Sequence, residues 1–144
     1  MKSQVIRKTS DDKLAGGIRL VLALLFLMTG AMKLLVPSLS EAWSGQLLAA
    51  ELPLYELTKW SVPFLEIFLG LALSLGIFAR LAVVVVMSIM VVATYVHLVV
   101  DDPSLFPLQP SEPIIPLAVL GFSSFVLWKG AGAWSLDLRA SRAT

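Results

Sequence analysis

The sequence predicts an all-α fold: an integral membrane four-helix bundle with both termini in the cytoplasm and a short interfacial helix in the first outer loop. Its residues are 58% hydrophobic and 15% charged, whereas soluble domains average about 45–50% and about 25%. A membrane-spanning helix needs roughly 20 mainly apolar residues. Four stretches meet this length, at about 14–36, 62–79, 81–100 and 114–133. Residues 14–133 would therefore form the membrane domain, between a basic tail at 1–13 and a second tail at 134–144.

The distribution of charge predicts which way the bundle faces. Most basic residues fall on the side that holds the two tails and the turn between the second and third spans: Lys2, Arg7, Lys8, Lys13, Arg19, Arg80, Lys129, Arg139 and Arg142. The opposite side holds most of the carboxylates: Glu41, Glu51, Glu56, Glu66, Asp101, Asp102 and Glu112. Loops rich in Lys and Arg stay in the cytoplasm. The tails are thus expected inside, and the acidic loops outside.

The two outer loops have different characters. Ser38 followed by Glu41 is a capping-box pattern, and Trp43, Leu47 and Leu48 continue at helical spacing, which predicts the interfacial helix. The second outer loop is rich in proline, so we expect it to be stiff and extended. Tryptophans near both membrane boundaries are typical of residues that anchor a protein at headgroup level.

Ionisable side chains inside the spans are the strongest functional signal. Arg19 and Lys33 are separated by fourteen residues, which places them about 21 Å apart along a helix and only about 40° apart around it. Glu66 and Arg80 have the same separation on the second span. Because adjacent spans run antiparallel, Lys33 and Glu66 should meet at similar depth on the outer side. Charges inside a bilayer are costly and usually functional.

These side chains predict a polar pocket at the outer end of the bundle. The third span ends there with His97, and the fourth begins there near Glu112. Met90 and Thr94 lie on the His97 face of the third span, so the polar groups would sit above an apolar cleft that suits a flat hydrophobic ligand such as a quinone. The expected ligand-binding residues are Lys33, Glu66, Met90, Thr94, His97 and Glu112. Glu66 and His97 are the candidates for proton exchange, and Arg19 and Arg80 are expected in structural ion pairs at the inner end.

Several cofactor chemistries are excluded by composition. The chain has no cysteine, so thiol–disulfide exchange and thiolate metal ligation are not available to it. A single histidine cannot supply a bis-histidine haem site. No phosphate-binding loop, nucleophile elbow or paired metal-spaced histidines occur, and no metal or nucleic-acid partner is expected.

In order and spacing, several short segments resemble the DoxX family of small four-helix membrane proteins of bacteria and archaea. Over roughly 17–137 the resemblance rests on Arg19 and on GAMK at 30–33, EIFLG at 66–70, GIFAR at 76–80 and GAGAWSLD at 130–137. The family is named after a subunit of a thiosulfate:quinone oxidoreductase. The resemblance implies four helices in a bacterial or archaeal cytoplasmic membrane, and a connection to quinone or sulfur redox chemistry or to a soluble partner enzyme.

Three functions follow as hypotheses. The leading one is a quinone-linked redox membrane subunit, in which Lys33 and Glu66 form the polar floor of the pocket and His97 or Glu66 exchanges protons. The second is a non-enzymatic scaffold that recruits a soluble redox or biosynthetic partner through its loops or tails. The third is a small-solute carrier gated by the Lys33–Glu66 pair, which at 144 residues would need a homo-oligomer. The sequence leaves open whether the protein is catalytic.

Overall fold

The computed structural model describes residues 7–143, and these are helical apart from their turns and loops. Lys2 of the predicted basic tail lies outside the described residues. The elements in chain order are α2 (Lys13–Leu35), α3 (Pro37–Ala49), α4 (Tyr55–Leu75), α5 (Ala79–Val99), the short 3-10 helix η1 (Pro103–Leu105), α6 (Ile114–Lys129) and α7 (Leu136–Arg142). The predicted all-α bundle is confirmed, together with a helix in the first long loop.

Three of the helices are long and apolar enough to cross a membrane: α2, α4 and α5. With 16 residues, α6 is shorter but also apolar. Their outward faces carry many exposed large apolar side chains, including Leu24, Phe64, Phe68 and Leu117, as expected where a protein contacts lipid tails. The chain is therefore a membrane protein with several spanning helices.

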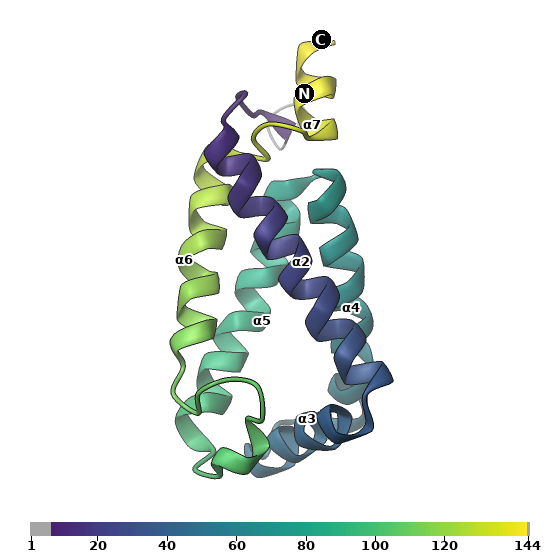
Figure 1. The fold of residues 1–144 in the computed structure, drawn as a ribbon, viewed down its shortest axis with the longest axis vertical. Coiled ribbons are helices and arrows are strands. Elements are labelled where there is room, and N and C mark those ends of the chain that lie inside the picture. Colours follow the sequence, from purple (N-terminus) through teal and green to yellow (C-terminus); the bar gives the residue numbers. More distant parts are fainter. Residues whose placement is uncertain (1–6, 144) are drawn as a thin grey trace.

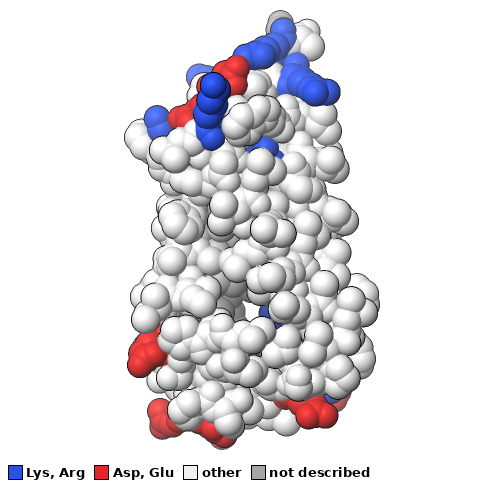
Figure 2. All heavy atoms as spheres, in the orientation of Figure 1, with Lys and Arg blue, Asp and Glu red and all other residues white. Residues whose placement is uncertain are grey.

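Charged side chains gather at the two ends of the long axis and leave an apolar band between them (Figure 2). We call the end that holds the N-terminal segment and α7 the basic end. The end that holds α3 and η1 is the acidic end (Figure 1).

The four longest apolar helices form two antiparallel pairs, α2 with α4 and α5 with α6. In Figure 1, α2 begins beside α6 at the basic end and crosses the bundle toward α4 at the acidic end. The main apolar core therefore lies where the pairs meet, with Leu22, Phe26, Leu73, Val83 and Val86 all buried. Farther toward the acidic end the pairs diverge, and α3 lies across the end of the bundle.

Two glycines let α2 and α4 approach closely. A Cβ atom at Gly30 would lie 2.7 Å from the Pro63 carbonyl oxygen, and one at Gly70 would lie 2.8 Å from the Leu27 backbone nitrogen. Real Cβ atoms essentially never make contacts below 3.0 Å. Small residues at such crossings are typical of helix association in membranes, and here they set the distance between the two charged helices.

Replacing Gly70 with valine is expected to lower the free energy of unfolding by about 1–3 kcal/mol, because the added methyl groups force α2 and α4 apart. Thermal unfolding in a mild detergent measures this. Gly121→Val is the matched control, since a Cβ at Gly121 meets nothing within 4 Å. Equal melting temperatures for the two variants would contradict the close helix contact.

Some element boundaries differ from the sequence prediction. Helix α4 begins at Tyr55 instead of near 62, with Pro63 inside it, and α6 ends at Lys129 instead of near 133. Gly130 stops α6 because its φ of 91° lies in a region that favours glycine. The capping-box prediction is wrong: α3 begins at Pro37, and its N-cap Val36 makes no side-chain capping bond.

Candidate functional site

A pocket of about 650 Å³ lies in the half of the bundle nearer the acidic end, where the two helix pairs diverge. Residues of α2, α3, α4, α5 and α6 line it, together with Pro107, Leu108 and Gln109 from the loop after η1. Most of the lining is aliphatic or aromatic, with a few polar side chains among them. This combination is typical of sites that bind small apolar molecules and orient them by a few polar contacts.

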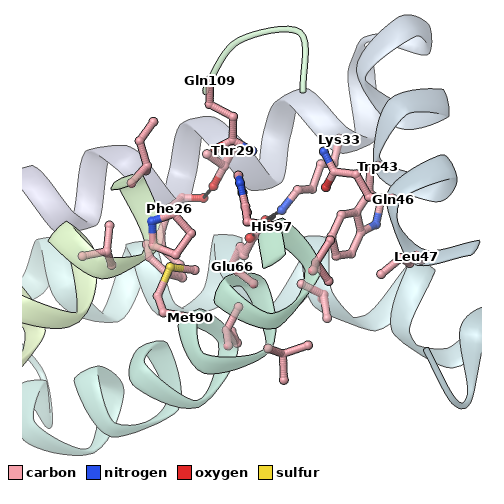
Figure 3. Close-up of a pocket in the computed structure, with 18 of the residues that line it drawn as sticks. Phe26, Thr29, Lys33, Trp43, Gln46, Leu47, Glu66, Met90, His97 and Gln109 are labelled. Carbon is pink, nitrogen blue, oxygen red and sulfur yellow. Dashed lines mark hydrogen bonds and ion pairs between the residues drawn. The ribbon is translucent and has the colours of Figure 1, made fainter. Parts of the chain in front are cut away.

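Lys33 and Glu66 form an ion pair in the pocket wall. The Lys33 Nζ atom donates to both carboxylate oxygens of Glu66, at 2.6 Å and 2.8 Å. The exposed fractions of the two side chains are 19% and 3%. The predicted meeting of the two helices at this depth is thus observed, and Figure 3 shows the pair reaching across from α2 and α4.

The glycine contact between α2 and α4 explains why the pair can form. Gly30 lies about one turn before Lys33, and a Cβ placed on it would come within 3.1 Å of the Glu66 Cβ atom. The backbones are therefore close enough for the long lysine chain to bend back onto the carboxylate. One turn beyond Glu66 along the same helix, Gly70 maintains the approach.

Helix α3 completes the polar surroundings of Lys33. The Nζ atom lies 4.4 Å from the centre of the Trp43 ring, a geometry in which the ring attracts a cation. The Trp43 indole N–H donates to the Lys59 carbonyl at 3.3 Å, which ties α3 to α4. Gln46, one turn further, donates its amide to the Leu105 carbonyl. Both side chains line the pocket.

His97 comes to the pocket from the last turn of α5, where only 8% of it is exposed. Its Nδ1 atom lies 2.8 Å from the Ser111 carbonyl oxygen. A carbonyl only accepts hydrogen bonds, so Nδ1 carries the proton and Nε2 of the neutral ring is left as an acceptor. The ring also packs against Phe106 at a centroid distance of 4.4 Å.

The loop between α5 and α6 is ordered by local hydrogen bonds. The Asp102 carboxylate accepts from the backbone and hydroxyl of Ser104, at 2.9 Å and 2.6 Å. These bonds favour the charged form and lower the pKa of Asp102 below its ordinary value. The same hydrogen bonds cap the N-terminus of η1. The chain then places Leu105 against α3 and Phe106 against α5.

Of the other three residues predicted for the pocket, one lines it and two do not. Met90 lines the pocket. Thr94 and Glu112 do not lie among the lining residues. The Thr94 hydroxyl instead donates to the Met90 carbonyl at 2.8 Å within α5, and Glu112 is exposed at the acidic end because it precedes the helix start.

Arg19 lies at the basic end of the bundle and is fully buried. Its guanidinium donates to five backbone carbonyls, those of Leu73, Ser74, Ala131, Ala133 and Trp134. Two of these belong to the last turn of α4, where the helix dipole favours a cation.

The expectation that Arg19 and Arg80 form ion pairs is wrong. Among residues 7–143, the ion pairs are Arg7–Asp137, Lys33–Glu66 and Arg142–Asp11. Arg80 instead donates to the Trp128 carbonyl at 3.1 Å. Asp137, one of the carboxylates at this end, accepts from the backbone N–H groups of Phe78 and Ala79, where α5 begins.

Sequence reasoning missed several polar residues of the pocket. Trp43 was interpreted as a headgroup anchor, and Thr29, Gln46, Ser88 and Gln109 were not singled out. Thr29 lies one turn before Lys33, so helical spacing alone could have found it. Gln46 and Gln109 could not be found in this way, because their positions depend on how α3 and the loop close the end of the bundle (Figure 3).

Comparison with known proteins identifies one relationship. The family model described as DoxX matches residues 15–98, which cover α2 through most of α5 and include Lys33, Glu66 and His97. No curated protein and no solved structure gives a match.

Proposed function

The chain belongs to the DoxX family, and from this membership and the pocket we propose that it is a quinone-linked membrane subunit. The quinone would bind in the pocket with its polar ring against Lys33, Glu66 and His97 and its apolar parts along the lining of α2, α5 and α6. The observation that carries the proposal is the Lys33–Glu66 pair in the wall of an otherwise mainly apolar cavity. A buried ion pair adds little or nothing to stability over apolar side chains of similar size, which favours a role in binding.

The polar groups supply complementary hydrogen bonds for the two redox forms. A quinone carbonyl only accepts, and the Lys33 ammonium retains N–H capacity beyond the two contacts to Glu66. A quinol hydroxyl donates, and with Nδ1 facing the Ser111 carbonyl, Nε2 of His97 would accept from it when the ring carries a single N–H. Quinone reduction takes up two protons and two electrons. Glu66 and His97 are the groups placed to exchange the protons, and the electrons come from a redox partner protein.

The distribution of charge supports a location of the pocket in the outer half of the membrane. If the basic end faces the cytoplasm, as the positive-inside rule predicts, both described chain ends lie on the cytoplasmic side and the pocket lies in the outer half of the membrane. The family resemblance supports the proposal that this membrane is a bacterial or archaeal cytoplasmic membrane. A reporter fused to the C-terminus that is active only in the cytoplasm tests the orientation.

Glu66→Gln is expected to weaken quinone binding by at least about tenfold, which corresponds to about 1.4 kcal/mol. The amide cannot hold the Lys33 ammonium by charge, so the donor that orients the quinone carbonyl loses its fixed position. Binding of short-tailed benzoquinone and naphthoquinone probes to detergent-purified protein can be followed by quenching of tryptophan fluorescence.

Glu56→Gln is the matched control, because Glu56 belongs to the same helix but is exposed in its first turn. It should bind the probes as the wild-type protein does. Equal affinity of Glu66→Gln and wild type, with both proteins folded, would count against the proposed site.

A further inference from the structure

Packed side chains cover much of the water-facing end of the pocket. Ala50, Val96, Val100 and Phe106 form a second apolar cluster, separate from the main core and buried at the acidic end. Leu105 packs so closely on α3 that a Cβ at Gly45 would lie 2.7 Å from it. The Gln46 amide and the His97 ring bind the same loop through Leu105 and Ser111. Pro107 and Leu108 of this loop line the pocket and are exposed, so a ligand entering from the aqueous side would have to pass or displace the loop.

The side of the pocket between α2 and α6 is open by contrast. Helix α4 occupies the face of α2 that carries Ala23, Leu27 and Gly30. The opposite face of α2 carries Leu25, Met28 and Met32, which line the pocket. These side chains therefore point away from α4. Met28 is 46% exposed although it lines the pocket.

Across from this stripe, the lining comes from the first two turns of α6, at Ile115, Pro116 and Val119. Figure 2 shows this face hollowed, with a basic side chain visible in the hollow. Among residues 7–143, Lys33 is the one Lys or Arg that lines the pocket. The opening lies in the apolar band between the two charged ends, so it faces lipid tails.

We propose that the pocket takes a membrane-dissolved ligand with a long apolar tail, which enters and leaves sideways between α2 and α6 with its tail lying across Met28. The inference rests on the proposed quinone function and adds the class of quinone and its route. The polar ring reaches Lys33 and Glu66 from the bilayer, while the tail stays among lipid chains and along the aliphatic side chains of both helices. A ligand held in this way does not have to pass the loop that covers the acidic end.

The test compares two tryptophan variants against two ligands in lipid nanodiscs. Met28→Trp narrows the α2–α6 opening. Val91→Trp is the matched control, because Val91 is 60% exposed on α5 and does not lie among the residues that line the pocket. The ligands are a quinone with a long isoprenoid tail and the same ring with a methyl or single-isoprene tail. Both replaced side chains are exposed, and unchanged melting temperatures establish that each variant is folded.

Met28→Trp is expected to weaken binding of the long-tailed quinone by about tenfold or more and to leave the short-tailed one within about twofold, while Val91→Trp changes neither. Unchanged long-tail binding in Met28→Trp, or loss in Val91→Trp alone, would overturn the lateral route and leave the quinone site standing. Wild-type protein that binds neither quinone would instead reject the proposed function itself.

Discussion

Arg19→Met is expected to lower the free energy of unfolding by at least about 4 kcal/mol and to leave little folded protein after detergent extraction. Hydrogen bonds from a charged group contribute about 1.5–3 kcal/mol each, and Arg19 makes five, to the end of α4 and the segment that follows α6. Methionine fills much of the volume but donates nothing, so five carbonyls lose a donor. Losses of this size are rare and occur when a buried network is broken.

Arg19→Lys should recover only part of the loss, since an ammonium has three donors and lacks the planar fork of the guanidinium. Arg80→Met is the control: Arg80 is less buried and contacts one carbonyl. Its melting temperature should stay much closer to that of the wild type. A stable Arg19→Met protein would mean that the two helix pairs are held together at the basic end by packing alone.

Removing both charges of the Lys33–Glu66 pair is expected to separate stability from binding. Lys33→Met alone should cost about 3–5 kcal/mol, because it leaves a nearly fully buried carboxylate without its partner. The double variant Lys33→Met/Glu66→Leu should regain most of this stability, since apolar side chains of similar size replace buried pairs with little loss. It should nevertheless lose quinone binding, because no polar group of the pair remains to orient the ring.

The measurements are thermal unfolding of the four proteins of the double-mutant cycle and probe binding to those that fold. A double variant that binds quinone as the wild type does would show that the pair has no part in recognition. A double variant as unstable as the single ones would show that the pair is structural.

Sequence periodicity predicted the helices well because apolar spans long enough for a bilayer have few alternatives. It also predicted the Lys33–Glu66 contact, since antiparallel neighbours place the end of α2 beside the early part of α4. Boundaries were less accurate. The predicted span at 62–79 left out residues 55–61 of α4, which include Lys59, although a lysine is tolerated near the end of a membrane helix.

Interactions with backbone atoms could not be predicted from residue types. A search for partners of Arg19 considers carboxylates, but the carbonyls that bind it become available only where α4 and α6 end beside α2. Glu112 and Thr94 were placed in the pocket because of their depth and helix face. The Thr94 hydroxyl instead bonds to the Met90 carbonyl of its own helix. The exposed position of Glu112 depends on the path of the loop before α6.

The central claim is that the pocket holds a quinone, and the most direct test is to identify what the protein carries. The full chain, extracted from membranes with a mild detergent, would be treated with organic solvent and the released molecules identified by mass spectrometry, with Glu66→Gln in parallel. The account predicts a stoichiometric long-tailed quinone in the wild-type protein and a marked loss in the variant. No quinone in either protein, after extraction from quinone-containing membranes, would contradict it and favour the scaffold hypothesis.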